Sequence, residues 1–195
     1  MERPKIRKEL WISIFIVGIM TLSTIGYVWI GQTSSNKIRY NNQVFTLENN
    51  KWTTKIGENK IGFDFLPTEV QEINMSREVS NKLYNAKLLQ LTFDPEQKEI
   101  EYTDYVRFEL ESVLSQKTGK TAVKNGVLNQ SETYPLLPVI DCANSTEFEP
   151  VIKFLKTNRT KIYDEENCII VETTNYVQAI AAKDRILYSI FNILK

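Results

Sequence analysis

Two cysteines are the residues of this chain whose pairing would have the largest chemical consequence. Cys142 and Cys168 are the only cysteines in the sequence, and each lies in or beside an apolar run that is typical of a strand. An even number of cysteines in an oxidising compartment favours a disulfide bond, here one that would join two neighbouring strands. Closing the loop between them would restrain the unfolded chain by about 3–4 kcal/mol. A redox pair or half of a metal site is the alternative.

Histidine is absent from the sequence. Its absence removes the Ser-His and Cys-His nucleophile pairs, the commonest general base and most zinc sites. Catalysis would therefore depend on carboxylates alone, which requires two acidic groups that converge in a cleft with separated pKa values. Because no motif commits the chain to a reaction, we expect no enzymatic activity, no metal and no cofactor. A surface hydrolase that uses carboxylates only is the alternative.

Four Asn-x-Ser/Thr sequons are present, at Asn74, Asn129, Asn144 and Asn158. In a protein that lies outside the cell, such sequons are possible sites of N-glycosylation. The alternative is that asparagine occupies turns at these positions, since asparagine is a common turn residue.

Periodicity singles out one carboxylate and two tyrosines. Asp184 lies four residues after Ile180 and four before Tyr188, on the apolar face of a predicted C-terminal helix. A carboxylate on such a face must be paired or capped, so we expect a structural buried charge that binds backbone donors or a basic residue. Tyr102 and Tyr105, near the start of another predicted helix, are candidates for recognition.

An uncharged segment near the N-terminus determines where these residues would lie in the cell. The 21 residues from Leu10 to Ile30 carry no charge, and a helix of that length spans roughly 31 Å, the thickness of the hydrocarbon core of a bilayer. Four basic residues precede the segment, whereas the first charge after it is Lys37. The positive-inside rule then places the N-terminus in the cytoplasm and the larger part of the chain outside. A cleaved signal peptide is the alternative.

On this interpretation the chain is a single-pass protein of the cell membrane with four parts. Residues 1–9 are a basic cytoplasmic tail, 10–31 a transmembrane helix in contact with lipid, 32–37 a polar linker, and 38–195 an extracytoplasmic domain with one core. Beyond the tail the chain carries 20 basic and 22 acidic residues. That balance excludes a nucleic-acid partner, which requires a basic surface.

Alternating apolar residues and turn formers predict an α+β domain with one mainly antiparallel sheet and helices packed on it. Four short runs indicate an antiparallel meander, and they are Ile38–Tyr40, Val44–Leu47, Trp52–Ile56 and Ile61–Leu66. Further strands are expected at Lys87–Asp94, Ala122–Leu128, Pro138–Cys142, Val151–Leu155, Thr160–Tyr163 and Cys168–Glu172. Helical periodicity predicts helices over Ser76–Ala86, Thr103–Gln116 and Asn175–Leu194.

The C-terminal third resembles a known group of proteins. The segments that carry the resemblance are Val139–Cys142, Pro150–Ile152, Asn158–Ile162, Asn167–Glu172 and Ala182–Tyr188. They look like small single-pass ectodomain proteins of archaea that have no assigned function. The resemblance implies an anchor followed by an outer domain, and it supplies neither an activity nor a catalytic residue.

These observations lead us to expect a membrane-anchored extracytoplasmic binding or assembly protein. Its role would be that of an accessory subunit of an envelope or membrane-protein complex, with a protein partner in the membrane or envelope. The apolar helix faces and the strand edges of the meander are both possible contacts. A stable complex of this kind should bury more than about 1,000 Å².

Overall fold

The first part of the domain is a four-stranded antiparallel sheet. The computed structural model describes residues 13–21, 37–99, 101–165 and 167–194. The strands of this sheet are β1 (Lys37–Tyr40), β2 (Gln43–Glu48), β3 (Lys51–Ile56) and β4 (Asn59–Phe63). Each strand pairs antiparallel with the next. The turns between them place Asn41, Asn49, Asn50 and Gly57 at positive φ, a conformation that asparagine and glycine tolerate best. The predicted meander is confirmed.

A second sheet of five strands forms the larger part of the domain. Its strands are β5 (Leu88–Phe93), β6 (Ala122–Asn125), β7 (Val151–Lys156), β8 (Lys161–Glu165) and β9 (Cys168–Thr173). They lie in the order β6-β5-β7-β9-β8. The pairs β5–β6, β5–β7 and β7–β9 are parallel, while β8 and β9 form an antiparallel hairpin.

The α+β class and the antiparallel sheet are therefore confirmed, but the structure differs from the prediction of a single sheet. Side-chain periodicity tells which faces of a strand are buried and not the direction of its neighbour. β5 and β6 are joined by α4 (Glu101–Glu111) and the π-helical turn η1 (Ser112–Lys117), and a crossover of this length returns the chain for a parallel pair. The strand predicted at Pro138–Cys142 is a loop that ends in the 3-10 turn η2 (Cys142–Asn144).

The remaining helices begin where the sequence supplies a cap. α2 (Pro67–Val70) starts with a proline, and α3 (Arg77–Asn85) follows Ser76, whose hydroxyl accepts a hydrogen bond from the backbone N–H of Val79. α5 (Tyr176–Ile190) follows Asn175, whose side chain accepts from the N–H of Gln178. The predicted C-terminal helix is confirmed, and it packs against α2, α3, α4 and β9.

The core lies between the helices and one face of the five-stranded sheet. Leu89 and Leu91 of β5 are fully buried there. The meander joins the same core through α5, because the rings of Phe45, Phe63 and Tyr188 pack together, edge-to-face or stacked. α5 therefore contributes to both parts of the domain.

The opposite face of the five-stranded sheet is contacted by residues 140–149, which belong to the segment between β6 and β7. Side chains of β5 hold it in place. Gln90 Nε2 donates a hydrogen bond to the backbone oxygen of Asn144 (3.1 Å), and Thr92 Oγ1 donates to that of Ile140 (2.8 Å). These bonds satisfy polar groups that the loop would otherwise bury without partners.

The predicted transmembrane helix falls largely outside the described residues. Residues 13–21, the described part of the predicted anchor 10–31, are helical. Within the ranges that the structure describes, no helix is both long enough and apolar enough to cross a membrane. The predicted tail 1–9 lies outside those ranges, as does the linker 32–37 apart from Lys37, which begins β1. Contacts divide the chain after residue 36, and the residues from Lys37 onward form one compact unit.

Candidate functional site

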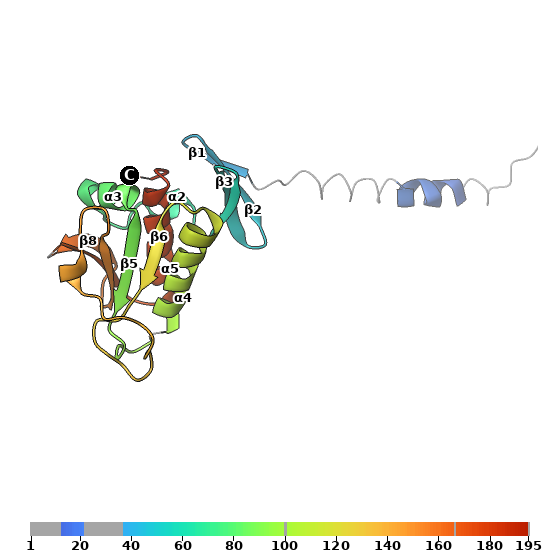
Figure 1. Ribbon diagram of the computed structural model, residues 1–195. Helices are drawn as coiled ribbons and strands as arrows, with labels where there is room; N and C mark the ends of the chain where they lie inside the picture. The colour runs from blue at the N-terminus through green and yellow to red at the C-terminus, as the bar shows by residue number, and fades with distance from the viewer. Residues whose placement is uncertain (1–12, 22–36, 100, 166, 195) are drawn as a thin grey trace, which may run out of the picture. The chain divides into compact units, whose positions relative to one another are not determined.

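The carboxyl ends of the parallel strands β5, β7 and β9 meet at one edge of the larger sheet, and α4 and α5 begin there (Figure 1). β5 leads to β6 on one side, whereas β7 leads to β8 and β9 on the other. In open α/β sheets, ligands bind in the crevice at such a point, where the strand order reverses. The topology therefore places a candidate site at this edge.

A cavity of about 620 Å³ lies at this edge, beside the first turns of α4 and α5. We call it the tyrosine groove, and its lining residues are Glu99, Glu101, Tyr102, Tyr105, Asn175 and Tyr176. Tyr102 and Tyr105 are three residues apart on α4, so their side chains project from neighbouring positions on one helix face. Asn175 caps α5 and directs Tyr176 into the first turn of that helix.

The Tyr176 ring of α5 lies against both tyrosine rings of α4. The ring centres of Tyr102 and Tyr176 are 6.5 Å apart with an interplanar angle of 66°. Those of Tyr105 and Tyr176 are 5.9 Å apart with an angle of 51°. Tyr102 is buried, whereas Tyr176 remains 48% exposed. The groove thus combines a fixed aromatic wall with an aromatic ring that solvent reaches.

A lysine from the end of β7 lies beside the groove. The Lys156 ammonium pairs with the Glu99 carboxylate and lies 5.9 Å from the centre of the Tyr102 ring, which is cation–π distance. The Tyr102 hydroxyl donates to Glu99 Oε2 (3.1 Å), and the backbone N–H of Lys156 donates to Gln97 Oε1 (2.9 Å). Burial and the charge of Glu101 raise the pKa of Tyr102, so its phenol stays a hydrogen-bond donor.

A separate network of charges joins the meander to the helices. Lys183 of α5 is 1% exposed, and its ammonium lies 2.6 Å from Asp64 Oδ2, 3.1 Å from Asp184 Oδ1 and 3.9 Å from Glu109 Oε2. Lys51 of β3 completes the network, because it pairs with the carboxylates of Asp64 and Glu109. Burial acts to lower the pKa of Lys183, but the charges of Asp184 and Asp64 raise it above its ordinary value. The ammonium is therefore charged.

Asp184 lies where helical periodicity places it, fully buried on the inner face of α5. Its Oδ2 accepts hydrogen bonds from the backbone N–H groups of Asp64 (2.8 Å) and Phe65 (2.9 Å). Burial raises the pKa of Asp184 to about 6, while the charge of Lys183 and the bond from Phe65 act in the opposite direction. With backbone donors on one oxygen and an ammonium near the other, the carboxylate has a structural role.

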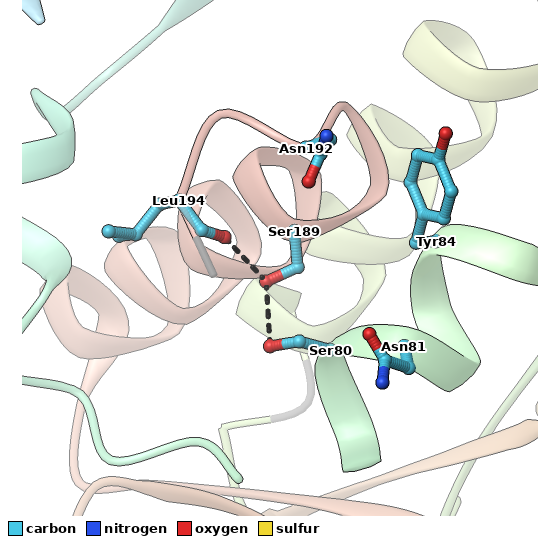
Figure 2. Close-up of a pocket in the computed structure, with 6 residues that line it drawn as sticks. All are labelled: Ser80, Asn81, Tyr84, Ser189, Asn192 and Leu194. Atoms are coloured by element: carbon cyan, nitrogen blue, oxygen red, sulfur yellow. Dashed lines mark hydrogen bonds between the residues drawn. The ribbon is translucent and has the colours of Figure 1, made fainter. Parts of the chain in front are cut away.

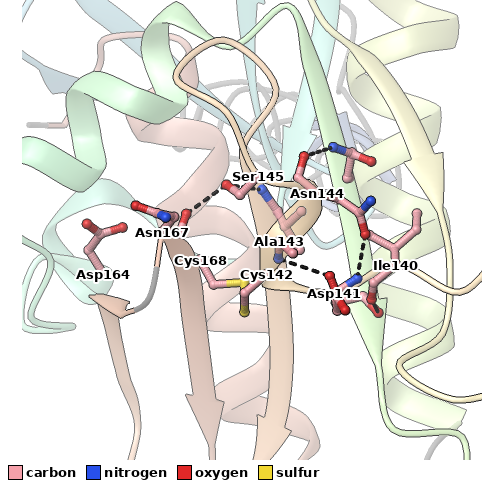
Figure 3. The surroundings of a disulfide bond; sticks show 12 residues. Ile140, Asp141, Cys142, Ala143, Asn144, Ser145, Asp164, Asn167 and Cys168 are labelled. Carbon is pink, nitrogen blue, oxygen red and sulfur yellow. Dashed lines mark hydrogen bonds between the residues drawn. A yellow bond between two sulfur atoms is a disulfide. The ribbon is translucent and has the colours of Figure 1, made fainter.

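The predicted disulfide is present between Cys142 and Cys168, whose Cα atoms are 5.1 Å apart (Figure 3). It differs from expectation in what it joins. Cys142 lies in the turn η2, so the bond ties the loop that covers the sheet to the start of β9. Ser145 strengthens the same connection, because its hydroxyl donates to the backbone oxygen of Asn167 (2.7 Å). The covering loop is thus held both covalently and by hydrogen bonds.

The four sequon asparagines, Asn74, Asn129, Asn144 and Asn158, are all exposed. Asn144 also has a local function, since its side-chain oxygen accepts from the backbone N–H of Asp141 (2.9 Å). That bond leaves the amide nitrogen, the atom to which a glycan is attached, free of this contact. Use of the sequons stays a prediction.

A smaller cavity of about 160 Å³ lies between α3 and the end of α5 (Figure 2). Its lining is mainly polar and consists of Ser80, Asn81, Tyr84, Ser189, Asn192 and Leu194. Behind it, the buried Arg185 donates from Nη1 to Ser189 Oγ (2.6 Å) and to the backbone oxygen of Leu194 (3.3 Å). These bonds fasten the residues after α5 to the helix, so we assign the cavity to the packing of the chain's end.

Sequence reasoning found two of the residues in the tyrosine groove, Tyr102 and Tyr105, and missed the other residues that line it. Glu99 and Tyr176 each follow a predicted strand, at the end where the chain leaves the sheet. That position becomes informative once the strands are known to be parallel, because their carboxyl ends then share one edge. An antiparallel pairing of β5 with β7 would have placed Lys156, at the end of β7, at the opposite edge from Glu99.

Comparison of the chain with models of known protein families, with curated proteins and with solved structures found no match in any of the three. The assignment of the candidate site therefore rests on the geometry of the described residues.

Proposed function

We propose that this chain is a membrane-anchored extracytoplasmic binding or assembly protein, an accessory subunit of an envelope or membrane-protein complex, and that the tyrosine groove is its contact site. The observation that carries the proposal is Tyr176, a ring that is 48% exposed beside a cavity. Covering an exposed aromatic ring removes a large apolar area from water, and such rings provide much of the binding free energy in protein interfaces.

Exposed apolar surface continues from the groove along α4. Phe108 lies three residues after Tyr105 on α4 and is 63% exposed. Residues three apart share a helix face, so Phe108 extends the surface of Tyr105. A partner in the groove could therefore bury these side chains in the same contact.

The disulfide supports the extracytoplasmic part of the proposal. Bonds such as Cys142–Cys168 form and persist in oxidising compartments and are rare in the cytosol. The membrane anchor itself is supported by the uncharged segment from Leu10 to Ile30 and by the basic residues before it.

The variant Tyr176→Ala tests the groove as the contact site. The full chain would be cross-linked in its native membrane, extracted in mild detergent and identified together with its partners by mass spectrometry. We expect a stoichiometric partner with the wild-type chain and its loss with Tyr176→Ala. Tyr84→Ala is the matched control, because Tyr84 is 46% exposed on α3, away from the groove.

Two results would contradict the proposal. A chain that runs alone at 22.7 kDa after cross-linking would refute the assembly role. A partner that Tyr176→Ala retains as well as Tyr84→Ala does would refute the groove as its site.

A surface hydrolase that uses carboxylates only is the second candidate, because Glu99 and Glu101 line the same cavity. Two carboxylates on either side of a bound sugar are the minimum equipment of most glycoside hydrolases. The test is turnover of chromogenic glycosides by the full chain. Activity that Glu99→Gln and Glu101→Gln each abolish would support this candidate, and absence of turnover by the wild-type chain would refute it.

A further inference from the structure

The three tyrosines of the groove are arranged as a corner. The plane of the Tyr176 ring is inclined by 66° to that of Tyr102 and by 51° to that of Tyr105, and all three line one cavity. The face of an aromatic ring is electron-rich and attracts a compact cation. Of the three rings, Tyr176 is the one that solvent reaches most, at 48% exposed.

The charges along the groove are negative. Its described lining residues include Glu99 and Glu101 but no lysine or arginine. Asp104, one turn further along α4, is neutralised by its ion pair with Arg107. The N-termini of α4 and α5 act in the opposite direction, since each carries roughly half a positive charge. Lys156 neutralises Glu99, so the attraction for a cation is local, at the exposed Glu101 carboxylate.

The contacts of Lys156 show that a carboxylate and a tyrosine ring of the groove can hold a cation together. Its ammonium combines a carboxylate partner, Glu99, with the face of a tyrosine ring, Tyr102. Glu101, Tyr105 and Tyr176 supply the same two kinds of group, a carboxylate and aromatic rings, in the lining of the cavity. Glu101 forms no ion pair with any residue that the structure describes.

We infer that the tyrosine groove binds the ammonium or guanidinium group of a lysine or arginine side chain on the partner protein. The inference rests on the proposed function and names the chemical class of the contact. The cation would lie against the rings of Tyr105 and Tyr176 and pair with Glu101. Lys156 competes with it for Glu99 and so weakens the site.

Small probes test the cation directly. The full chain, with its tyrosine rings labelled with carbon-13, would be titrated in detergent with N-acetyl-lysine methylamide, and the ring resonances followed by NMR. We expect the resonances of Tyr105 and Tyr176 to shift. N-acetyl-norleucine methylamide has nearly the same side-chain length without the charge and should leave them unchanged. Equal shifts with both probes, or none with the lysine probe, would overturn the inference.

Variants separate a local charge effect from a general one. Replacing Glu99 and Glu101 together by glutamine should weaken binding of the lysine probe by about three-fold or more. Replacing the exposed Glu132 and Glu147 by glutamine changes the net charge equally and should leave the affinity unchanged. If the two double variants behave alike, the groove is not the site.

Lys156→Met gives a change in the opposite direction. Removing the internal ammonium leaves Glu99 for the probe, so the affinity should rise by about three-fold. A loss of affinity would show that Lys156 builds the site instead of competing for it, which contradicts the inference.

The inference and the proposed function fail in different ways. If cellobiose shifts the rings and the lysine probe does not, the groove takes sugars and the cation is refuted. If neither probe binds while Tyr176→Ala still loses the partner, the cation is again refuted and the contact site stands. If the lysine probe binds while Tyr176→Ala keeps the partner, the groove is refuted as the contact site, and the partner is refuted as the source of the cation.

Discussion

Replacing Lys183 by methionine should destabilise the domain by about 3–5 kcal/mol at neutral pH. The Lys183 ammonium lies 2.6 Å from Asp64 Oδ2 and 3.1 Å from Asp184 Oδ1, and the side chain is 1% exposed. Methionine keeps most of the apolar stem but leaves Asp184 as a fully buried carboxylate without a counter-charge. Breaking a buried ion pair by removing one partner costs about 3–5 kcal/mol.

The cost should depend on pH, because Asp184 can take up a proton. The pKa of its carboxyl is raised from an ordinary value of 3.8 to about 6, so the native state binds this proton more tightly than the unfolded state. The resulting stabilisation is complete below about pH 4 and is lost as the pH rises through 6. Removing Lys183 raises the pKa of Asp184 in the folded state further. Each additional pKa unit adds about 1.4 kcal/mol to the stability that is lost between low and high pH. The variant should therefore lose less at pH 5 than at pH 7.5.

Urea unfolding of the full chain in detergent, followed by tryptophan fluorescence at both pH values, measures this difference. Lys60→Met is the matched control, because Lys60 pairs with Glu48 on the surface and both side chains are exposed. Loss of such a pair should cost at most about 1 kcal/mol at either pH. If Lys183→Met costs no more than this control, or costs the same at both pH values, the reasoning about a buried charge is refuted.

Two further changes test the covering loop. Replacing Cys142 and Cys168 together by serine should lower the free energy of unfolding by about 3–4 kcal/mol. Thiol labelling of the unfolded, unreduced wild-type chain should find no free thiol. Two labelled thiols would contradict the bond. Gly126→Ala should destabilise by about 1–3 kcal/mol, because the new Cβ would lie 2.5 Å from Ile140 Cδ1 and 2.7 Å from the backbone oxygen of Pro138. An unchanged melting temperature would show that the loop relaxes around the methyl group.

Local patterns in the sequence were enough to predict the meander, the final helix and the position of Asp184. The turns at Asn49-Asn50 and Gly57 require backbone conformations that few residues adopt, so the residues themselves mark the hairpins. In α5 the apolar period places Asp184 on the inner face, and a carboxylate there needs donors. The donors could not be named, because Asp64 and Phe65 are more than 100 residues away in sequence.

The direction of the strands, and with it the site, could not be predicted from such patterns. β5, β7 and β9 show the burial of strands covered on both faces, and this burial is compatible with either direction. Residues 126–150 link β6 to β7 without a long helix, so the usual sign of a parallel unit is absent from that connection. Lys156 reaches Glu99 only because β5 and β7 are parallel, which brings their carboxyl ends to one edge.

The late position of α5 has a consequence for biosynthesis. Tyr188 stacks on Phe63, 125 positions earlier in the chain, and Asp184 binds the backbone N–H groups of Asp64 and Phe65, 120 and 119 positions earlier. The meander is synthesised first, yet it gains these partners only when the last helix has left the ribosome. Contacts between such distant segments also form slowly. Until α5 is available, the N–H groups of Asp64 and Phe65 and the ring of Phe63 lack these partners, so the meander is the less stabilised part of the domain while the chain is being made.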